Sequence, residues 1–267
     1  MVRGYRILAY LKWLPKTFHL HGIHSPFVYQ LQRDCLHVQD KNPSKAVIAL
    51  FNQARLFLLR QKTSIAVCDF GAGSIKLGEQ RSIRSIVRHV SASPSRMRLL
   101  YRLSSYFEVI HALELGTSVG LGTLALSQGA KQVTTWEGCP ESATLAQSLF
   151  KKYQISNVEL VVGSFRACLQ ELDQRRQESE TSPCYDLLYL DGHHEEQATK
   201  DYFDKLLFHT HPQSVVILDD IYWSPGMTRA WRAIQQHPQV TVSVDCFFFG
   251  LVFFKKDQAK EYFHIRI

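Results

Sequence analysis

Residues 109–128 read V-I-H-A-L-E-L-G-T-S-V-G-L-G-T-L-A-L-S-Q. The apolar run ends at Glu114, passes through Gly116, Gly120 and Gly122, and continues as a helical pattern of small residues. This order predicts a buried strand, a tight glycine turn and the start of a helix. Glycines in such a turn let a nucleotide-like ligand approach the backbone closely, which we expect at Gly116 and Gly120.

The sequence after this turn strengthens the interpretation, because a glycine turn after a strand is common by itself. A second strand pattern, at residues 132–136, ends in Glu137. In nucleotide-binding α/β folds an acidic side chain about 20 residues beyond the turn accepts hydrogen bonds from the ribose hydroxyls. We therefore expect Glu137 to bind ribose through both carboxylate oxygens.

From about residue 106 onward, strand and helix patterns alternate, which is typical of a doubly wound α/β sheet. The strands are expected at residues 109–115, 132–136, 158–162, 185–190, 214–218, 241–244 and 247–255, and the helices at 121–128, 140–153, 165–175, 195–208 and 227–236. Only Asp245 and Cys246 separate the last two strands, which suits an antiparallel hairpin. The prediction is a mostly parallel seven-stranded sheet, Rossmann-like, with a terminal antiparallel hairpin.

The N-terminal third has a different pattern. We predict a mainly helical extension at residues 1–105, with one strand at 64–70 and a basic helix after Gly78, followed by the α/β domain at 106–267. The extension is expected to cap the substrate side of that domain. Its first twenty residues are amphipathic, a pattern that serves either a membrane interface or packing on the domain; we favour packing.

Bulk properties narrow the class of protein. The chain has 267 residues, 45% of them apolar, which is enough for a full core. Six scattered cysteines without a C-x-x-C pair indicate neither a zinc knuckle nor a disulfide framework, and favour a reduced, cytoplasmic setting. Basic residues interrupt the apolar runs of the first twenty residues, so we expect no membrane span there.

The net charge of +7 leaves two interpretations open. Either the basic stretch at residues 76–102 meets an anionic partner such as nucleic acid, or it is a solvated helix surface; we favour the solvated surface.

With this arrangement, residues 109–256 resemble the class I S-adenosylmethionine-dependent methyltransferases, most of all the small O-methyltransferases related to the catechol, caffeoyl-CoA and macrocin enzymes. The likeness lies in four stretches at the ends of successive strands: A-L-E-L-G-T-S-V-G, T-W-E-G-C-P-E, Y-D-L-L-Y-L-D-G-H-H and V-V-I-L-D-D-I-Y-W. The N-terminal H-G-I-H-S-P-F stretch resembles bacterial methyltransferases of this type. The resemblance implies S-adenosyl-L-methionine as the cofactor and a small hydroxylated molecule as the acceptor.

The resemblance also implies roles for residues beyond the glycine turn. Glu114 would lie near the cationic part of the cofactor. Gly163, Ser164 and Phe165 follow the third strand, where relatives often carry an acid that binds the adenine amino group. Here Ser164 would accept that bond and Phe165 would cover the ring, although Ser164 serves equally well as the N-cap of the next helix.

Three aspartates end two later strands, and they suggest a metal. Carboxylates at Asp191, Asp219 and Asp220 would repel one another unless a cation such as Mg²⁺ lay among them. By resemblance, relatives hold a divalent metal with such aspartates, and the metal orients an acceptor hydroxyl. The alternative is that Asp191 contacts the cofactor or substrate without any metal.

His194 lies three residues after Asp191, where catechol-type relatives place a catalytic lysine. An imidazole can take the acceptor proton at neutral pH, so we expect His194 and Asp191 to be catalytic. His193 is a poorer candidate, and both histidines also fit an exposed loop.

Several alternatives stay open. The D-F-G-A-G-S stretch at residues 69–74 is a competing nucleotide turn, disfavoured because no second strand ends in an acid near residue 90. An RNA methyltransferase or a non-catalytic cofactor-binding protein of the same fold would also account for the pattern, and a dehydrogenase fits less well because of the terminal hairpin. Self-association as a homodimer is left open.

Overall fold

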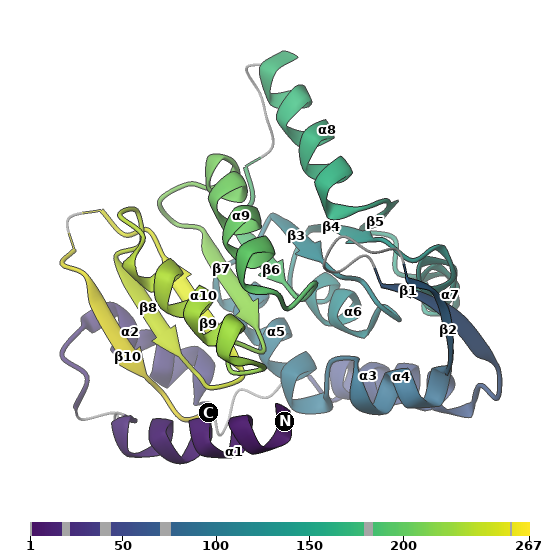
Figure 1. The fold of residues 1–267 in the computed structure, drawn as a ribbon, viewed down its shortest axis with the longest axis horizontal. Helices are drawn as coiled ribbons and strands as arrows, with labels where there is room; N and C mark the ends of the chain where they lie inside the picture. The colour runs from purple at the N-terminus through teal and green to yellow at the C-terminus, as the bar shows by residue number, and fades with distance from the viewer. Residues whose placement is uncertain (1, 18–21, 38–43, 70–75, 179–183, 257) are drawn as a thin grey trace. The chain divides into compact units, whose positions relative to one another are not determined.

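The computed structural model describes residues 2–17, 22–37, 44–69, 76–178, 184–256 and 258–267. One eight-stranded sheet has the strand order β10-β8-β9-β7-β6-β3-β4-β5, and a separate two-stranded sheet pairs β1 with β2 (Figure 1). The larger sheet is mostly parallel, with antiparallel pairing only where β9 lies between β7 and β8. This is the Rossmann-like arrangement predicted from the alternation of strands and helices.

The chain divides into two compact units, residues 38–182 and residues 1–37 with 183–267. The predicted domain boundary at residue 105 falls inside the first of these units and stays a prediction. Residues 38–182 contain α3 (Lys45–Arg60), β1 (Ser64–Asp69), β2 (Lys76–Ser82), α4 (Ile83–His89), α5 (Pro94–Tyr106), β3 (His111–Leu115), α6 (Leu121–Ser127), β4 (Gln132–Glu137), α7 (Pro140–Lys152), β5 (Val158–Val162) and α8 (Phe165–Glu178).

The other unit is built from both ends of the chain. It contains α1 (Val2–Trp13), the 3-10 helix η1 (Leu14–Lys16), α2 (Pro26–Leu31), the π-helix η3 (Gln32–Leu36), β6 (Leu187–Leu190), α9 (Glu196–Leu206), the 3-10 helix η5 (Leu207–His209), β7 (Val215–Asp219), α10 (Pro225–Gln236), β8 (Val242–Asp245), β9 (Phe249–Phe253) and β10 (Glu261–His264). In Figure 1, α9 and α10 cover one face of its strands and α2 lies on the other. The contacts agree: Trp231 of α10 lies against Gly250, and the Phe27 ring packs edge-on against Phe253, with 4.9 Å between centroids.

The central strands β6 and β7 of this unit are buried, and their sequences are almost entirely apolar. L-L-Y-L in β6 and V-V-I-L-D in β7 are buried at every position, as expected for central parallel strands covered on both faces. α10 begins at Ser224, whose side chain accepts a hydrogen bond from the Met227 N–H, and Pro225 follows at the first helical position. The cap and the proline fix where α10 begins, shortly after the end of β7 at Asp219.

Three parts of the sequence interpretation need correction. The sheet has eight strands rather than seven, because β10 adds a parallel edge strand beside β8. The predicted hairpin forms, as β8 and β9, but β9 also pairs with β7, so the hairpin is not the terminal element. The residues directly after Gly78 continue the strand β2 to Ser82 rather than begin the basic helix, because they pair antiparallel with β1.

Candidate active site

The turn after β3 has the backbone geometry that its glycines predicted. Gly116 has φ 104° and Gly120 has φ 84°, a region that side chains with a Cβ disfavour. The Gly116 N–H donates to the Trp136 carbonyl on β4 at 2.9 Å, and a Cβ at Gly120 would lie 2.9 Å from Cε1 of Phe150 on α7. Both glycines are therefore required to bring the turn close to its neighbours.

Glu137 ties this turn to the end of β4. Its Oε2 accepts a hydrogen bond from the Ser118 N–H at 2.7 Å, and its Oε1 accepts one from the Cys139 N–H at 2.8 Å. Burial raises the pKa of the Glu137 carboxyl, and the backbone donors at Cys139, Ser118 and Gly138 oppose that rise. The two carboxylate oxygens have four acceptor positions together, so the three backbone donors leave one position open for a hydroxyl hydrogen.

Glu114 lies deeper, in a buried network of threonines. Its Oε2 accepts hydrogen bonds from the hydroxyls of Thr123 on α6 and Thr135 on β4, the latter at 2.7 Å. Because the Thr135 hydrogen is donated to Glu114, the Thr117 hydroxyl donates to Thr135, at 2.6 Å. Burial raises the pKa of Glu114 to about 7, in spite of the threonine donors. The carboxylate thus joins β3, β4 and α6, and its predicted contact with the cofactor stays a prediction.

The segment after β5 begins α8. Ser164 is the N-cap of this helix: its hydroxyl oxygen accepts from the Ala167 N–H at 3.2 Å, and its carbonyl accepts from the Cys168 N–H at 3.0 Å. The Gly163 N–H donates to the Glu137 carbonyl at 2.9 Å, which places this turn beside the end of β4. The capping alternative for Ser164 is therefore present, and the adenine contacts of Gly163, Ser164 and Phe165 remain predictions.

In the other unit, one tyrosine lies between two of the three predicted aspartates. The buried Tyr189 hydroxyl is 3.0 Å from Oδ2 of Asp191 and 3.3 Å from Oδ2 of Asp219. Asp219 is buried, and its Oδ1 accepts from the Asp220 N–H at 2.8 Å. A hydroxyl has a single hydrogen, so the two carboxylates share one donor.

The third aspartate faces a cation from the N-terminal helix. Asp220 has φ 49°, and its Oδ1 lies 3.8 Å from a guanidinium nitrogen of Arg6 on α1. The Arg6 guanidinium also lies over the Trp223 ring, 5.2 Å from its centroid. Over the described residues, no group of three His, Cys, Asp or Glu side chains is arranged to hold a metal ion. The Mg²⁺ prediction for Asp191, Asp219 and Asp220 is therefore unsupported, because a tyrosine and an arginine already contact these carboxylates.

The two loop histidines have different surroundings. His194 Nε2 lies 3.6 Å from Oδ1 of Asp191, and its ring is tilted against Trp223 with 6.1 Å between centroids. The His193 ring stacks on Tyr202, and its Nδ1 is 2.5 Å from the tyrosine hydroxyl. Of the two, His194 is thus the one beside a predicted catalytic carboxylate.

Sequence reasoning missed three participants in these contacts: Arg6, Ser118 and Tyr189. Tyr189 could have been found, because residues two apart on a strand share a face and Tyr189 lies two before Asp191. Arg6 and Ser118 act through tertiary contacts that carry no signal in the sequence. The competing turn at residues 69–74 lies, apart from residue 69, outside the described residues.

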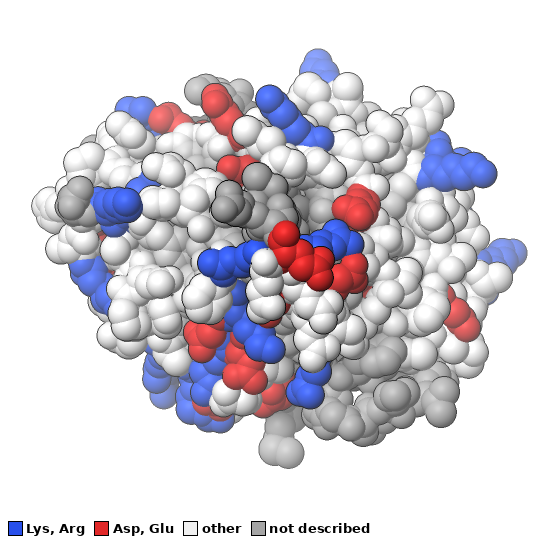
Figure 2. All heavy atoms as spheres, turned by 90° about the horizontal axis from the view of Figure 1, so that it is seen from above, with Lys and Arg blue, Asp and Glu red and all other residues white. Residues whose placement is uncertain are grey.

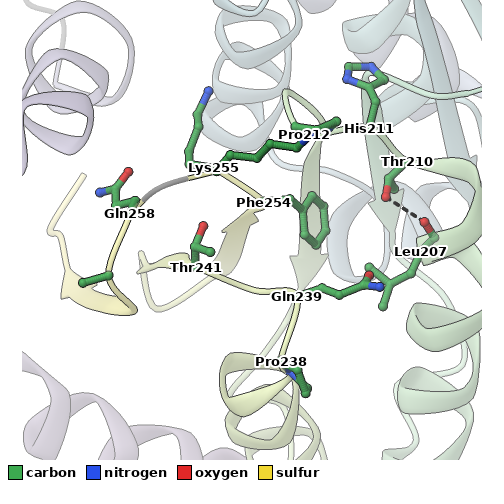
Figure 3. Close-up of a pocket in the computed structure, with 12 residues that line it drawn as sticks. Leu207, Thr210, His211, Pro212, Pro238, Gln239, Thr241, Phe254, Lys255 and Gln258 are labelled. Carbon is green, nitrogen blue, oxygen red and sulfur yellow. Dashed lines mark hydrogen bonds between the residues drawn. The ribbon is translucent and has the colours of Figure 1, made fainter.

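A cavity of about 650 Å³ lies elsewhere in the unit formed by the two chain ends (Figure 3). It is bordered by the loop before β7, the residues before β8 and those after β9, and its lining includes His211, Phe254 and Lys255. None of the predicted site residues is among those lining it. We therefore do not assign the methyl-transfer site to this cavity.

The comparisons with known proteins agree with this geometry. A family profile described as a methyltransferase domain matches residues 113–221, which span the glycine turn, Glu137 and all three aspartates. This part of the chain is therefore similar to a methyltransferase domain. No protein among those with curated descriptions matches the chain.

Solved structures show the same fold at low identity. An O-methyltransferase from Bacillus cereus in complex with SAH is 18% identical, with a TM-score of 0.56 over 79% of this chain and 92% of its own. The O-methyltransferase TomG from Streptomyces achromogenes, in complex with SAM, is 17% identical, with a TM-score of 0.57 over 81% and 92%. An SAH-bound methyltransferase from Podospora anserina is 13% identical, with a TM-score of 0.57 over 82% and 91%.

Proposed function

We propose that this methyltransferase is a cytoplasmic O-methyltransferase that transfers a methyl group from S-adenosylmethionine to a hydroxyl of a small molecule. The observation that carries the proposal is Glu137, a buried carboxylate that backbone N–H groups of the glycine turn and of the end of β4 hold in place, with acceptor capacity left for a hydroxyl hydrogen. The hydroxyl acceptor is supported by the names of the structural neighbours in Bacillus cereus and Streptomyces achromogenes.

The residues present fit the cofactor. The glycine turn has no side chain at Gly116 or Gly120, and Glu137 places at the end of β4 a carboxylate that can accept from a ribose hydroxyl. When bound, S-adenosylmethionine supplies a methyl group on a sulfonium, which an acceptor oxygen displaces in line. Holding donor and acceptor in reactive contact can contribute roughly 7–11 kcal/mol, so binding and orientation are the main tasks of the protein.

We assign the proton to His194. The acceptor hydroxyl loses its hydrogen as the oxygen–carbon bond forms, and a ring nitrogen of His194 takes it. The Asp191 carboxylate, 3.6 Å from Nε2, stabilises the imidazolium that results. Asp191 is itself contacted by the Tyr189 hydroxyl, which fixes its orientation. No step passes through a metal, because the aspartates do not form a donor set for one.

Calorimetry and a turnover assay test the proposal together. Wild-type protein should bind S-adenosylhomocysteine, and Glu137→Ala should weaken binding by about 1–3 kcal/mol, the cost of losing hydrogen bonds to a charged group. Glu159→Gln is the matched control, since it removes an exposed carboxylate on β5 of the same unit. Methyl-labelled cofactor with a panel of catechols and polyphenols should give labelled product, with activity unchanged by a chelator.

Each failure has its own meaning. Unchanged affinity in Glu137→Ala would remove that residue from the site. Cofactor binding with no turnover on a broad panel would favour a non-catalytic binding protein. Loss of activity on chelation, restored by Mg²⁺, would reinstate the metal. Labelling of RNA, with binding that weakens steeply as salt increases, would instead favour an RNA methyltransferase.

A further inference from the structure

Helix α1 has an inner face that anchors it to its own unit. The Tyr5 hydroxyl donates to Oγ1 of Thr228 at 2.7 Å. The Tyr10 ring packs edge-on against Phe247 with 5.0 Å between centroids, and Trp13, which is 3% exposed, packs on the same phenylalanine at 5.5 Å. These aromatic contacts explain why the amphipathic N-terminal segment packs on the protein, as favoured from the sequence.

The opposite face of the same helix is apolar and uncovered. Ile7, Leu8 and Leu11 are 63%, 60% and 60% exposed, and their spacing places them on one side of the helix. Gly4, one turn earlier, adds open space on that side, because a Cβ there would meet nothing within 4 Å. Phe208 is the one other large apolar side chain with as much exposure among the described residues, and it lies on η5 rather than on α1. The three side chains therefore form a compact exposed patch, which we call the α1 patch.

The charged residues of the N-terminal segment itself all have one sign. Residues 1–17 contain Arg3, Arg6, Lys12 and Lys16 and no aspartate or glutamate. Lys12 and Lys16 are exposed, whereas Arg6 is directed to Asp220 and Trp223. An apolar helix face flanked by exposed lysines is the pattern of a helix that lies in the interface of an anionic membrane.

We propose that α1 docks this protein on an anionic lipid surface, with the α1 patch inserted at the boundary between headgroups and acyl chains and with Lys12 and Lys16 on the lipid phosphates. Two observations favour lipid over a protein partner. Lys12 and Lys16 are exposed and belong to a segment without acidic residues, so they complement an anionic surface. A stable protein interface buries about 800 Å² per partner, more than three side chains can supply. Within the described residues no helix is long and apolar enough to cross a membrane, so the proposed association is peripheral.

Vesicle co-sedimentation tests the proposal with the full chain. Wild-type protein should sediment with vesicles containing phosphatidylglycerol and remain in solution with pure phosphatidylcholine. Leu8→Ser with Leu11→Ser should lower the partition coefficient at least tenfold, because two large apolar side chains no longer enter the bilayer. Lys12→Gln with Lys16→Gln should lower it roughly 25-fold at low salt, about fivefold for each lysine. Phe208→Ser is the matched control, which should bind vesicles like the wild type.

Further measurements on the same variants distinguish a loss of lipid binding from a loss of folding or of self-association. The variant side chains face outward, so thermal unfolding and S-adenosylhomocysteine affinity should match the wild type. Absence of wild-type binding to anionic vesicles would overturn the proposal, as would equal binding by the Leu8→Ser, Leu11→Ser variant. A wild-type dimer in sedimentation equilibrium that this variant converts to a monomer would show that a second copy covers the patch instead of lipid. None of these outcomes depends on the methyl acceptor, so they are independent of the proposed function.

Discussion

His194 lies in a loop, where its backbone has φ 36° and its backbone N–H donates a hydrogen bond to the Gly192 carbonyl at 2.8 Å. Its Nε2 is too far from Asp191 for a hydrogen bond but close enough for a strong electrostatic interaction once the ring is protonated. If this ring takes the acceptor proton, His194→Ala should lower kcat by about 10²–10⁴-fold while the affinity for S-adenosylhomocysteine is retained. Steady-state kinetics and calorimetry on the same preparation measure both quantities.

His193→Ala is the neighbouring control for this variant. His193 stacks on Tyr202 and bonds its hydroxyl, so its loss should alter loop stability more than the rate of the chemical step. A His194→Ala enzyme with normal kcat, or one whose cofactor affinity falls as far as its kcat, would contradict the assignment of the proton to His194.

Single residues were predictable where chain spacing determines their place. The position of Glu137 follows from the distance between one strand end and the next, and the positive φ of Gly116 and Gly120 follows from the turn. The partners of Asp191 and Asp220 differ in this respect. Tyr189 lies two residues before Asp191 and could have been inferred from strand spacing, whereas Arg6 approaches Asp220 through tertiary packing. Without these two partners, a metal was the simplest means of balancing the charge.

At the scale of elements, the junction of β3 and α6 depends on Gly120. Gly120→Ala should destabilise the protein by about 1–2 kcal/mol, because φ 84° is unfavourable for a residue with a Cβ and because that Cβ would press on Phe150 of α7. Urea denaturation measures the change. Gly4→Ala is the matched control, since its Cβ would have nothing within 4 Å.

A second substitution separates the two causes. Phe150→Leu in the Gly120→Ala background removes the ring contact and leaves the backbone strain, so only part of the lost stability should return. Full recovery of the free energy of unfolding would show that the backbone strain at φ 84° contributes nothing to the loss. No recovery would show that the contact with Phe150 contributes nothing.

Elements were predictable from sequence where burial produces an apolar run. The strands β3 to β7 fall where the apolar runs predicted them, within two residues at each end. β2 was missed because K-L-G-E-Q-R-S is polar and is extended only through its pairing with β1. β10 was missed because it is a four-residue edge strand, too short to show a period of two.

At the scale of the whole molecule, some of the basic side chains make hydrogen bonds within the fold. The Arg84 Nε donates to the Leu59 carbonyl in the last turn of α3, and Arg55 donates to the Val87 carbonyl in α4. On the face drawn in Figure 2, acidic side chains lie among the basic ones. The net charge of +7 therefore gives less support to nucleic-acid binding than a single basic stripe would.

The described core encloses three carboxylates, Glu114, Asp219 and Asp245, each about 1–2% exposed. Asp245 accepts from the Tyr222 hydroxyl at 2.7 Å and from the Trp231 indole N–H at 3.1 Å. A buried carboxyl whose pKa differs between the folded and the unfolded chain makes the stability of the protein depend on pH. Glu114 gives the clearest case, since burial raises its pKa from 4.5 to about 7.

The sign of this dependence follows from the direction of the shift. A raised pKa means that the folded protein holds the Glu114 proton more tightly than the unfolded chain does. The resulting stability is fully present below pH 4.5 and is lost as the pH rises through about 7. The loss should be roughly 3 kcal/mol, from about 1.4 kcal/mol for each pH unit between the two pKa values.

Glu114→Gln should remove this part of the pH dependence. The amide oxygen can still accept from Thr123 and Thr135, and it carries no charge at any pH. The free energy of unfolding, measured by urea titration without cofactor from pH 4.5 to pH 8, should fall less in the variant than in the wild type. Glu137, whose pKa burial also raises, is present in both proteins and largely cancels in the difference. Parallel curves for the two proteins would mean that Glu114 is ionised throughout this range, and that its threonine donors compensate fully for its burial.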